Sequence, residues 1–425
     1  MTYIKNVQML NENGDLVPVE VVIQDQKIQA LGRNVTPDDV TDEVIDGKGG
    51  LITPGLIDVH VHFREPGFTD KETILTGSEA AARGGFTTVF AMPNLKPVPD
   101  NPETFAELDA LNKKNGRIKI EQYASISKDL TSETILVDFK GLNEAGAIAF
   151  TNDGVGVQTA GLMYQAMLEA AGCGKPLVAH TEDNSLLFDG VMHAGPRAEE
   201  LELPGMLGLT ESTQIARDVL LAEKAGVHYH VCHVSTKESV RVIRDAKRAG
   251  IHVTCEVAPH HLILTDADIP GDDANYKMNP PLREEADRQA LIEGLLDGTI
   301  DCIATDHAPH TAEEKARGFK EAPFGITGLE IAFQLMFTHF VKPGIFTLKQ
   351  VVDWLTAKPA ELFNLDRGTL AVGQPADLAI FDLEDEQVIR AEDFVSKSSN
   401  TPFIGEKIFG TTRYTICDGE IVYQN

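Results

Sequence analysis

Short apolar runs recur about every thirty residues through the middle of the chain, and most are separated by stretches of helical periodicity. Eight of these runs predict strands, at 55–62, 85–94, 118–126, 146–153, 175–183, 227–235, 251–259 and 299–306. Intervening stretches such as 211–226 and 236–250 have apolar residues at i, i+3 and i+4 and end in glycine, as amphipathic helices do. This alternation predicts parallel βαβ units, and eight units predict a closed (β/α)8 barrel of the TIM type. A doubly wound open sheet is the alternative, but no GxGxxG follows the first strand.

The two ends of the chain have a different pattern from the middle. Both show short alternating runs broken by turn residues, which is typical of β-hairpins, and Asp418-Gly419 marks a tight turn. Two β-rich ends around an α/β middle suggest that the termini come together. We therefore expect an α/β protein in which residues 1–53 and 365–425 form a small composite β-sandwich domain and residues 54–364 form the barrel.

Polar residues stand at the ends of the predicted strands. Alternation along the first strand puts His60, His62 and Arg64 on one face. With the ends of four further strands, the chain offers six metal-ligating side chains: His60, His62, Asp153, His180, His233 and Asp306. Active sites of such barrels lie at the carboxyl ends of the strands, so we expect these six to converge. Each buried polar group costs ~1–3 kcal/mol unless satisfied, and a metal ion satisfies all of them together. Imidazole with carboxylate favours zinc over manganese or cobalt.

Composition narrows the range of partners and compartments. The net charge of −28 argues against nucleic acid and anionic membranes as partners. Five scattered cysteines in apolar, strand-like runs indicate buried thiols in a reducing cytoplasm. No apolar run reaches the ~18 residues of a membrane span, and MTYIKNVQML lacks the features of a signal peptide. We expect a cytoplasmic protein with a small-molecule substrate; a homodimer is compatible with these data.

Several motifs resemble those of the dihydroorotases, a family within the cyclic amidohydrolase superfamily. DVHVHFREP (58–66) and ATDHAPHTAEEK (304–315) are similar to the two signature segments of that family. Further segments resemble its longer, bacterial type or the return into a composite β domain: AMPNLKPVPDN (91–101), EVAPHHL (256–262), KMNPPLR (277–283) and GQPADLAIFD (373–382). The resemblance implies a zinc-dependent hydrolase that interconverts N-carbamoyl-L-aspartate and L-dihydroorotate in pyrimidine (UMP) biosynthesis.

The resemblance also implies how the ligands are shared between metals. His60, His62 and Asp306 would hold the first zinc, and His180 and His233 the second. Many members of the superfamily bridge two metals with a carbamylated lysine. This chain has Asp153 in the corresponding run, AIAFTNDGVGV, so an aspartate bridge is implied, with one or two zinc ions per subunit.

The remaining site residues are nominated by the same resemblance. Asp306 would be the catalytic acid/base, because it lies beside the metal. Arg64 would grip the substrate α-carboxylate with two hydrogen bonds. The other substrate-binding positions are His62, Asn94, Asn279, His310, Phe324 and Gly325. Residues 307–325 are expected to form a lid.

Histidines outside this set are expected to be structural. We assign His260 and His261 to packing or to support of the site, and His228, His230 and His252 to the interior of their strands. Two other functions compete with the one implied. A hydantoinase or allantoinase would act on an uncharged ring, against which Arg64 weighs. A catalytically dead scaffold protein would be expected to lose metal ligands, and all six positions carry ligand-competent residues.

Overall fold

The computed structural model describes residues 1–35 and 43–425, and every strand predicted for the barrel is present. The eight strands are β5 (Leu56–Val61), β6 (Phe86–Ala91), β7 (Lys119–Gln122), β8 (Phe150–Thr151), β9 (Leu177–Ala179), β12 (Tyr229–Val231), β13 (Val253–Val257) and β14 (Cys302–Ile303). Every one of these strand residues is buried except the first three of β7, as expected for parallel strands covered on both faces.

The eight strands close into a ring. They form two parallel sheets, ordered β5-β6-β7 and β14-β13-β12-β9-β8. Parallel bridges close both seams: Ala124 pairs with Phe150 on one side, and Val61 pairs with His307 on the other. The predicted (β/α)8 barrel is therefore confirmed, and the open sheet is excluded.

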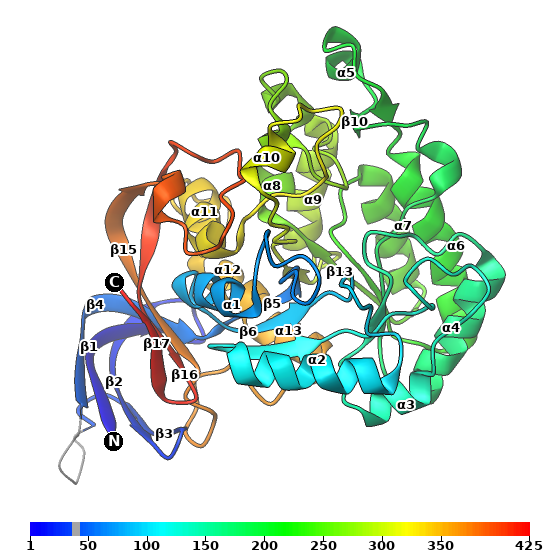
Figure 1. Cartoon of the computed structure of the whole chain (residues 1–425). Helices are drawn as coiled ribbons and strands as arrows, with labels where there is room; N and C mark the ends of the chain where they lie inside the picture. Colours follow the sequence, from blue (N-terminus) through cyan, green and yellow to red (C-terminus); the bar gives the residue numbers. More distant parts are fainter. Residues whose placement is uncertain (36–42) are drawn as a thin grey trace.

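Helices surround the strands and cover their outer faces (Figure 1). In α7, Val240, Ile243 and Ala246 form the buried stripe that the sequence pattern predicts. The helices are α1 (Ile74–Arg83), α2 (Pro102–Asn115), α3 (Phe139–Glu144), α4 (Ala160–Gly172), α5 (Pro196–Glu200), α6 (Leu209–Ala225), α7 (Lys237–Arg248), α8 (Pro259–Ile263), α9 (Glu285–Leu296), α10 (Ala312–Lys315), α11 (Ala332–Met336), α12 (Leu348–Leu355) and α13 (Ala357–Leu362). None of the helices in the described part of the chain has the length and apolar character needed to cross a membrane.

The two ends of the chain share one seven-stranded sheet beside the barrel (Figure 1). Its order is β17-β16-β15-β4-β1-β2-β3, and its only parallel pair is β1 with β4. The strands are β1 (Thr2–Leu10), β2 (Leu16–Gln24), β3 (Lys27–Gly32), β4 (Glu43–Pro54), β15 (Leu378–Val388), β16 (Lys407–Cys417) and β17 (Glu420–Gln424). Asp418 and Gly419 have φ of 49° and 80°, as a tight hairpin turn between β16 and β17 requires. The domain limits at 53/54 and 364/365 stay predictions.

Two details of the chain differ from what its sequence pattern suggests. Cys173 is half-buried at the end of α4, because the apolar run around it is helical; the other four cysteines are buried free thiols. Between β9 and α6 the chain makes an excursion of short elements, in which β10 (Met192–His193) pairs in parallel with β11 (Gly205–Met206). The excursion carries α5, which projects from the molecule (Figure 1).

Candidate metal centre and substrate cavity

The six side chains predicted as metal ligands meet at the carboxyl end of the barrel. Each stands at a strand end or within three residues after it: His60 and His62 at β5, Asp153 after β8, His180 after β9, His233 after β12 and Asp306 after β14. All six are buried. The barrel thus gathers residues from five strands into one place, as the strand-end pattern predicts.

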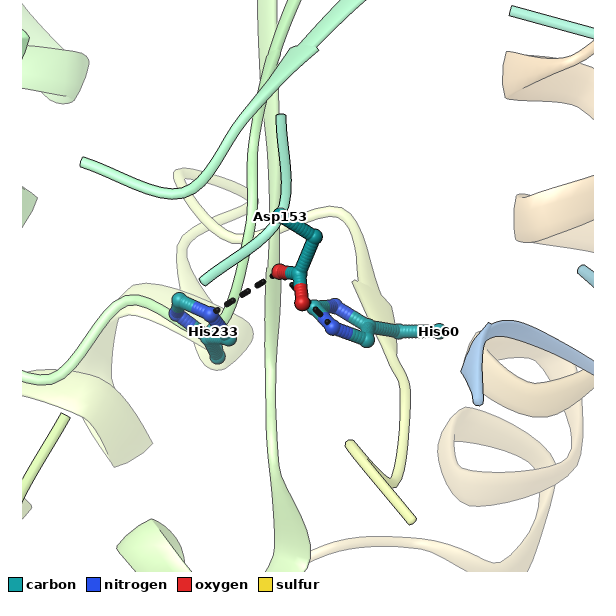
Figure 2. Close-up of side chains that lie close together, drawn as sticks. All are labelled: His60, Asp153 and His233. Carbon is teal, nitrogen blue, oxygen red and sulfur yellow. Dashed lines mark ion pairs between the residues drawn. The ribbon is translucent and has the colours of Figure 1, made fainter. Parts of the chain in front are cut away.

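Asp153 lies at the centre of this group. Its Oδ1 is 3.2 Å from His60 Nε2 and 3.8 Å from His233 Nε2 (Figure 2), and its Oδ2 is 3.4 Å from His62 Nε2. Two sets of ligand atoms each lie within 4.8 Å of one another: His60 with His62 and Asp306, and His60 with Asp153 and His233. One carboxylate therefore faces both the β5 histidines and the histidine that follows β12.

The cluster contains buried polar atoms that no protein group satisfies. His60 Nε2 and Asp153 Oδ1 have no hydrogen-bond partner among the described residues. His180 Nδ1 is 3.0 Å from His233 Nε2, so two ring nitrogens face each other at hydrogen-bond distance. Buried polar groups are almost always satisfied, and a cation among these nitrogens and oxygens would satisfy them together. The residues present therefore fit a divalent metal.

Partners behind the β5 histidines turn one nitrogen of each ring toward the cluster. His60 Nδ1 is 2.6 Å from Glu256 Oε1, and His62 Nδ1 is 2.8 Å from Asn94 Oδ1. Both partners accept hydrogen bonds, so each Nδ1 carries the proton and each Nε2 is left bare for a metal. Glu256, on β13, was missed in the sequence reasoning. The signal was present, since it is a charged residue inside the apolar run IHVTCEVAP.

Backbone geometry at the strand ends aims several of these side chains. Arg64, His233 and Asp306 have φ of 60°, 30° and 50°, in the left-handed region that non-glycine residues rarely adopt. Strain of this kind concentrates at functional sites. For Arg64 it also corrects the sequence argument: β5 ends at Val61, so a turn, and not strand alternation, brings the guanidinium to the same side as His62.

A cavity of about 230 Å³ opens onto the cluster. Its lining contains every residue predicted to bind substrate and five of the six predicted ligands, all but His60: His62, Arg64, Asn94, Asp153, Gly154, His180, His233, Asn279, Asp306, Ala308, His310, Phe324 and Gly325. The structure thus brings the predicted set together around one small space. Which of these residues touch substrate stays a prediction.

Arg64 enters this cavity without an acidic partner. Its Nε donates to the Pro309 carbonyl at 3.3 Å, and no carboxylate within residues 1–35 and 43–425 lies at ion-pair distance from it. Glu65 accepts a hydrogen bond from the Ile74 backbone instead. Burial lowers the pKa of Arg64 to about 10, which still leaves it charged at neutral pH. The cavity therefore has a half-buried positive charge available to an anionic ligand.

Asp306 and His310 differ in their fitness for proton transfer. Burial raises the pKa of Asp306, but the neighbouring His60 and His62 outweigh this and hold it below its usual range, so the carboxylate is ionised. Burial and the charges of Arg64 and Lys71 lower the pKa of His310 to about 3, so its ring is neutral. His310 Nε2 donates to the Phe324 carbonyl at 2.8 Å. At neutral pH Asp306 is thus ionised, whereas His310 is uncharged.

Two buried lysines fasten the segment 307–325 over this cavity. Lys315, on α10, donates to the carbonyls of Lys277 and Pro323 at 3.1 and 3.0 Å. Lys277 Nζ lies 4.5 Å from the centre of the Phe324 ring and donates to the Lys320 carbonyl. The segment is therefore anchored in this conformation. Whether it opens as a lid stays a prediction.

Lys315 is expected to make stability depend on pH. Burial and the neighbouring Lys277 lower the pKa of Lys315 to about 7, whereas an unfolded lysine titrates near ~10.4. Between these values unfolding takes up a proton, so the free energy of unfolding rises with pH, by at most ~1.4 kcal/mol per unit. In denaturant titrations from pH 7 to 9.5, wild type should gain stability relative to Lys315→Met. Exposed Lys320→Met is the control, and parallel curves for Lys315→Met and wild type would contradict the expectation.

Four of the remaining histidines, His228, His230, His252 and His261, do not line the cavity. His230 contacts Glu256 and Thr254, while His228 stacks on His252 with ring centres 4.2 Å apart, toward the amino ends of the strands. His261 is buried and faces the Pro280 carbonyl, as its assignment to packing implies.

Comparison with known proteins gives the family. The description "Dihydro-orotase-like" matches residues 49–239 and "Amidohydrolase family" matches 297–423. A dihydroorotase of Enterococcus faecalis is 61% identical over 99% of this chain and 98% of its own length, and one of Staphylococcus aureus is 58% identical over 100% of this chain and 99% of its own length.

Among solved structures, an L-hydantoinase (dihydropyrimidinase) of Arthrobacter aurescens superposes with a TM-score of 0.88 at 27% identity, covering 100% of this chain and 96% of that one. A D-hydantoinase superposes with 0.85 at 28%, covering 100% and 95%. The barrel, the ligand cluster and these relatives agree: the chain belongs to the dihydroorotase family of the amidohydrolases.

Proposed function

We propose that the chain reversibly interconverts N-carbamoyl-L-aspartate and L-dihydroorotate, the ring closure of pyrimidine biosynthesis. The observation that carries this proposal is the half-buried Arg64, which has no carboxylate partner among the described residues, in the same small cavity as five of the six metal-ligating side chains. One end of that cavity suits an anion, and the other suits hydrolysis of an amide. Full-length relatives named dihydroorotase, 58–61% identical, support the same substrate.

Zinc is the metal we propose for the cluster, because four imidazoles and two carboxylates are the ligands it prefers. His60, His62 and Asp306 would hold one ion, and His180 and His233 a second. Asp153 would bridge them, a role supported by its contacts with histidines of both sets. When bound, the metal supplies activation of a water molecule and polarisation of the ring carbonyl.

Asp306 would move the proton. In ring opening its carboxylate accepts the proton released as water adds to the carbonyl carbon of the ring amide. It then delivers that proton to the ring nitrogen as the carbon–nitrogen bond breaks. Microscopic reversibility requires protonated Asp306 to begin the cyclisation. The burial of Asp306 beside the ligand cluster and its position 3.1 Å from His62 Nε2 support the assignment.

The substrate carboxylate would lie at the other end of the cavity. A guanidinium grips a carboxylate with two parallel hydrogen bonds, and Arg64 is the charged donor there. His310 and the backbone at Phe324 and Gly325 would line the same end. Asn94 and Asn279 would face the ring, although each already bonds to the protein, Asn94 to His62 and Asn279 to Glu182.

A hydantoinase-type function is less favoured. The solved hydantoinases share the fold at 27–28% identity, well below the dihydroorotase relatives. An uncharged ring would also leave the half-buried Arg64 without an anionic partner in the cavity. The scaffold hypothesis is disfavoured because all six predicted positions carry side chains that can bind a metal, and these side chains meet at one place.

Arg64→Met is expected to lose about 2 kcal/mol of transition-state stabilisation, roughly a 30-fold fall in kcat/KM for dihydroorotate, because a charged hydrogen-bonded pair is lost. Metal content should not change, since Arg64 does not contact the cluster. Steady-state kinetics and metal analysis of the purified variant test this. Arg117→Met, which removes a surface arginine paired with Glu79, is the matched control. An unchanged kcat/KM in Arg64→Met would remove the clamp and revive the uncharged-ring alternative.

A further inference from the structure

A segment from outside the barrel reaches the carboxylate end of the cavity. Residues 395–400 lie between β15 and β16, which belong to the seven-stranded sheet. Ser398 Oγ donates to the Lys71 carbonyl at 2.9 Å, and the Ser396 hydroxyl bonds to the buried carboxylate of Glu72. The segment is thus tied to the loop that begins at Arg64.

The last residue of this segment, Asn400, is tied to the cavity wall itself. Its Oδ1 accepts a hydrogen bond from the His310 backbone N–H at 3.1 Å. Its Nδ2 donates to the carbonyls of Gly325 at 3.0 Å and Ala308 at 3.3 Å. All three partners line the cavity, whereas Asn400 does not. Both amide hydrogens and the oxygen are used, so this orientation of the amide is fixed by its partners.

The partners of Asn400 belong to two backbone segments, 308–310 and the segment at Gly325, which must stay a fixed distance apart. Gly325 has φ of 134°, and a Cβ there would lie 2.7 Å from the Ala308 Cβ and 3.0 Å from His310 Nε2. Arg64 Nε donates to Pro309, between Ala308 and His310. A shift of 308–310 relative to 325 would therefore change both the width of the cavity and the position of the guanidinium.

We propose that Asn400 is a positioning residue that sets the carboxylate end of the cavity, and so the preference for a carboxylate-bearing ring. It acts by cross-linking 308–310 to Gly325 through one amide, without touching substrate. The inference rests on the proposed function, in that Arg64 must bind the substrate carboxylate. A neutral amide is needed there because it must both accept and donate.

Asn400→Ala and Asn400→Asp test the proposal. Alanine removes all three bonds; aspartate keeps the shape and the bond from His310 but sets an oxygen against two carbonyls. Because misplacement of about 1 Å can cost 10²-fold, each variant should lose roughly ten- to a hundredfold in kcat/KM for dihydroorotate. Most of the loss should be in KM, with kcat and metal content near wild type. The control is Ser399→Ala, whose hydroxyl makes no hydrogen bond to any described residue and which should behave as wild type.

A double-mutant cycle with Arg64→Met separates positioning from general damage. If Asn400 acts through the carboxylate end, adding Asn400→Ala to Arg64→Met should cost far less than Asn400→Ala alone. Additive losses, a loss confined to kcat, or an unchanged KM in both folded Asn400 variants would each overturn the positioning role. If Arg64→Met itself raises KM, those results contradict only the role of Asn400, and the proposed function still holds. An Arg64→Met variant with wild-type kinetics would instead overturn the carboxylate clamp and this inference with it.

Discussion

Asp306→Asn should slow ring opening and ring closure alike by at least about 10²-fold, and up to 10⁴-fold, the usual range for general acid–base catalysis. Asparagine keeps the shape of the side chain and one oxygen toward His60 and His62, but it cannot take up the proton. Because one group serves both directions, neither rate should be spared. We do not expect His310 to take over the proton transfer, since its ring is neutral and donates to the Phe324 carbonyl.

Initial rates in both directions, with metal analysis of the same preparation, test this expectation. Metal held by His60 and His62 should be largely retained, so that the loss can be assigned to proton transfer. Asp301→Asn is a matched control, because Asp301 lies on the same strand-and-loop unit but pairs with Lys247 at 2.7 Å, away from the cavity. A variant that kept its metal and more than about a tenth of the wild-type rate in either direction would fall short of the range above and exclude Asp306 as the shuttle.

Asp153→Ala is expected to remove metal as well as activity. Losing even an indirect partner of a metal ligand costs ~10–100-fold in affinity, so loss of a shared ligand should cost at least ~100-fold. Metal should be lost more from the His180 and His233 side, because the His60 side retains Asp306 within 3.3 Å. Activity should fall with metal occupancy and recover in part when excess zinc is added.

Elemental analysis and titration against a chelator measure this loss. Asp183→Ala provides the comparison: Asp183 follows β9 at the same mouth of the barrel, but its carboxylate accepts hydrogen bonds from Ser185. If Asp153→Ala lost metal equally from both sides, or retained all of it, Asp153 could not be the bridge.

The sequence predicts the strands and the ligand cluster because both follow from local order. Burial on both faces makes each parallel strand a short apolar run, and barrel geometry alone then brings His60, Asp153, His180 and Asp306 to one end. The catalytic and substrate-binding roles of individual residues were predicted only from the resemblance to the family. The position of Arg64 was reached for the wrong reason, since a left-handed turn and not strand alternation directs it into the cavity.

Residues that act across the fold could not be predicted in this way. Asn400 meets Ala308, His310 and Gly325 only because the seven-stranded sheet docks beside the barrel, and nothing near Asn400 in sequence marks it. The sequence around Lys315 is typical of a charged surface stretch, yet its ammonium group is buried and donates to two backbone carbonyls. Such contacts depend on tertiary packing, which local periodicity does not record.

The sharing of one sheet between the two ends of the chain has a consequence for biosynthesis. One edge of β4 pairs with β1, but on the other edge Pro54 pairs with Leu378 of β15, so the ribosome must make the entire barrel before that second edge is covered. At ~5–20 residues per second this interval lasts on the order of tens of seconds. During that time the edge of β4 that faces away from β1 stays unpaired, and an unpaired strand edge is the kind of surface that recruits other chains.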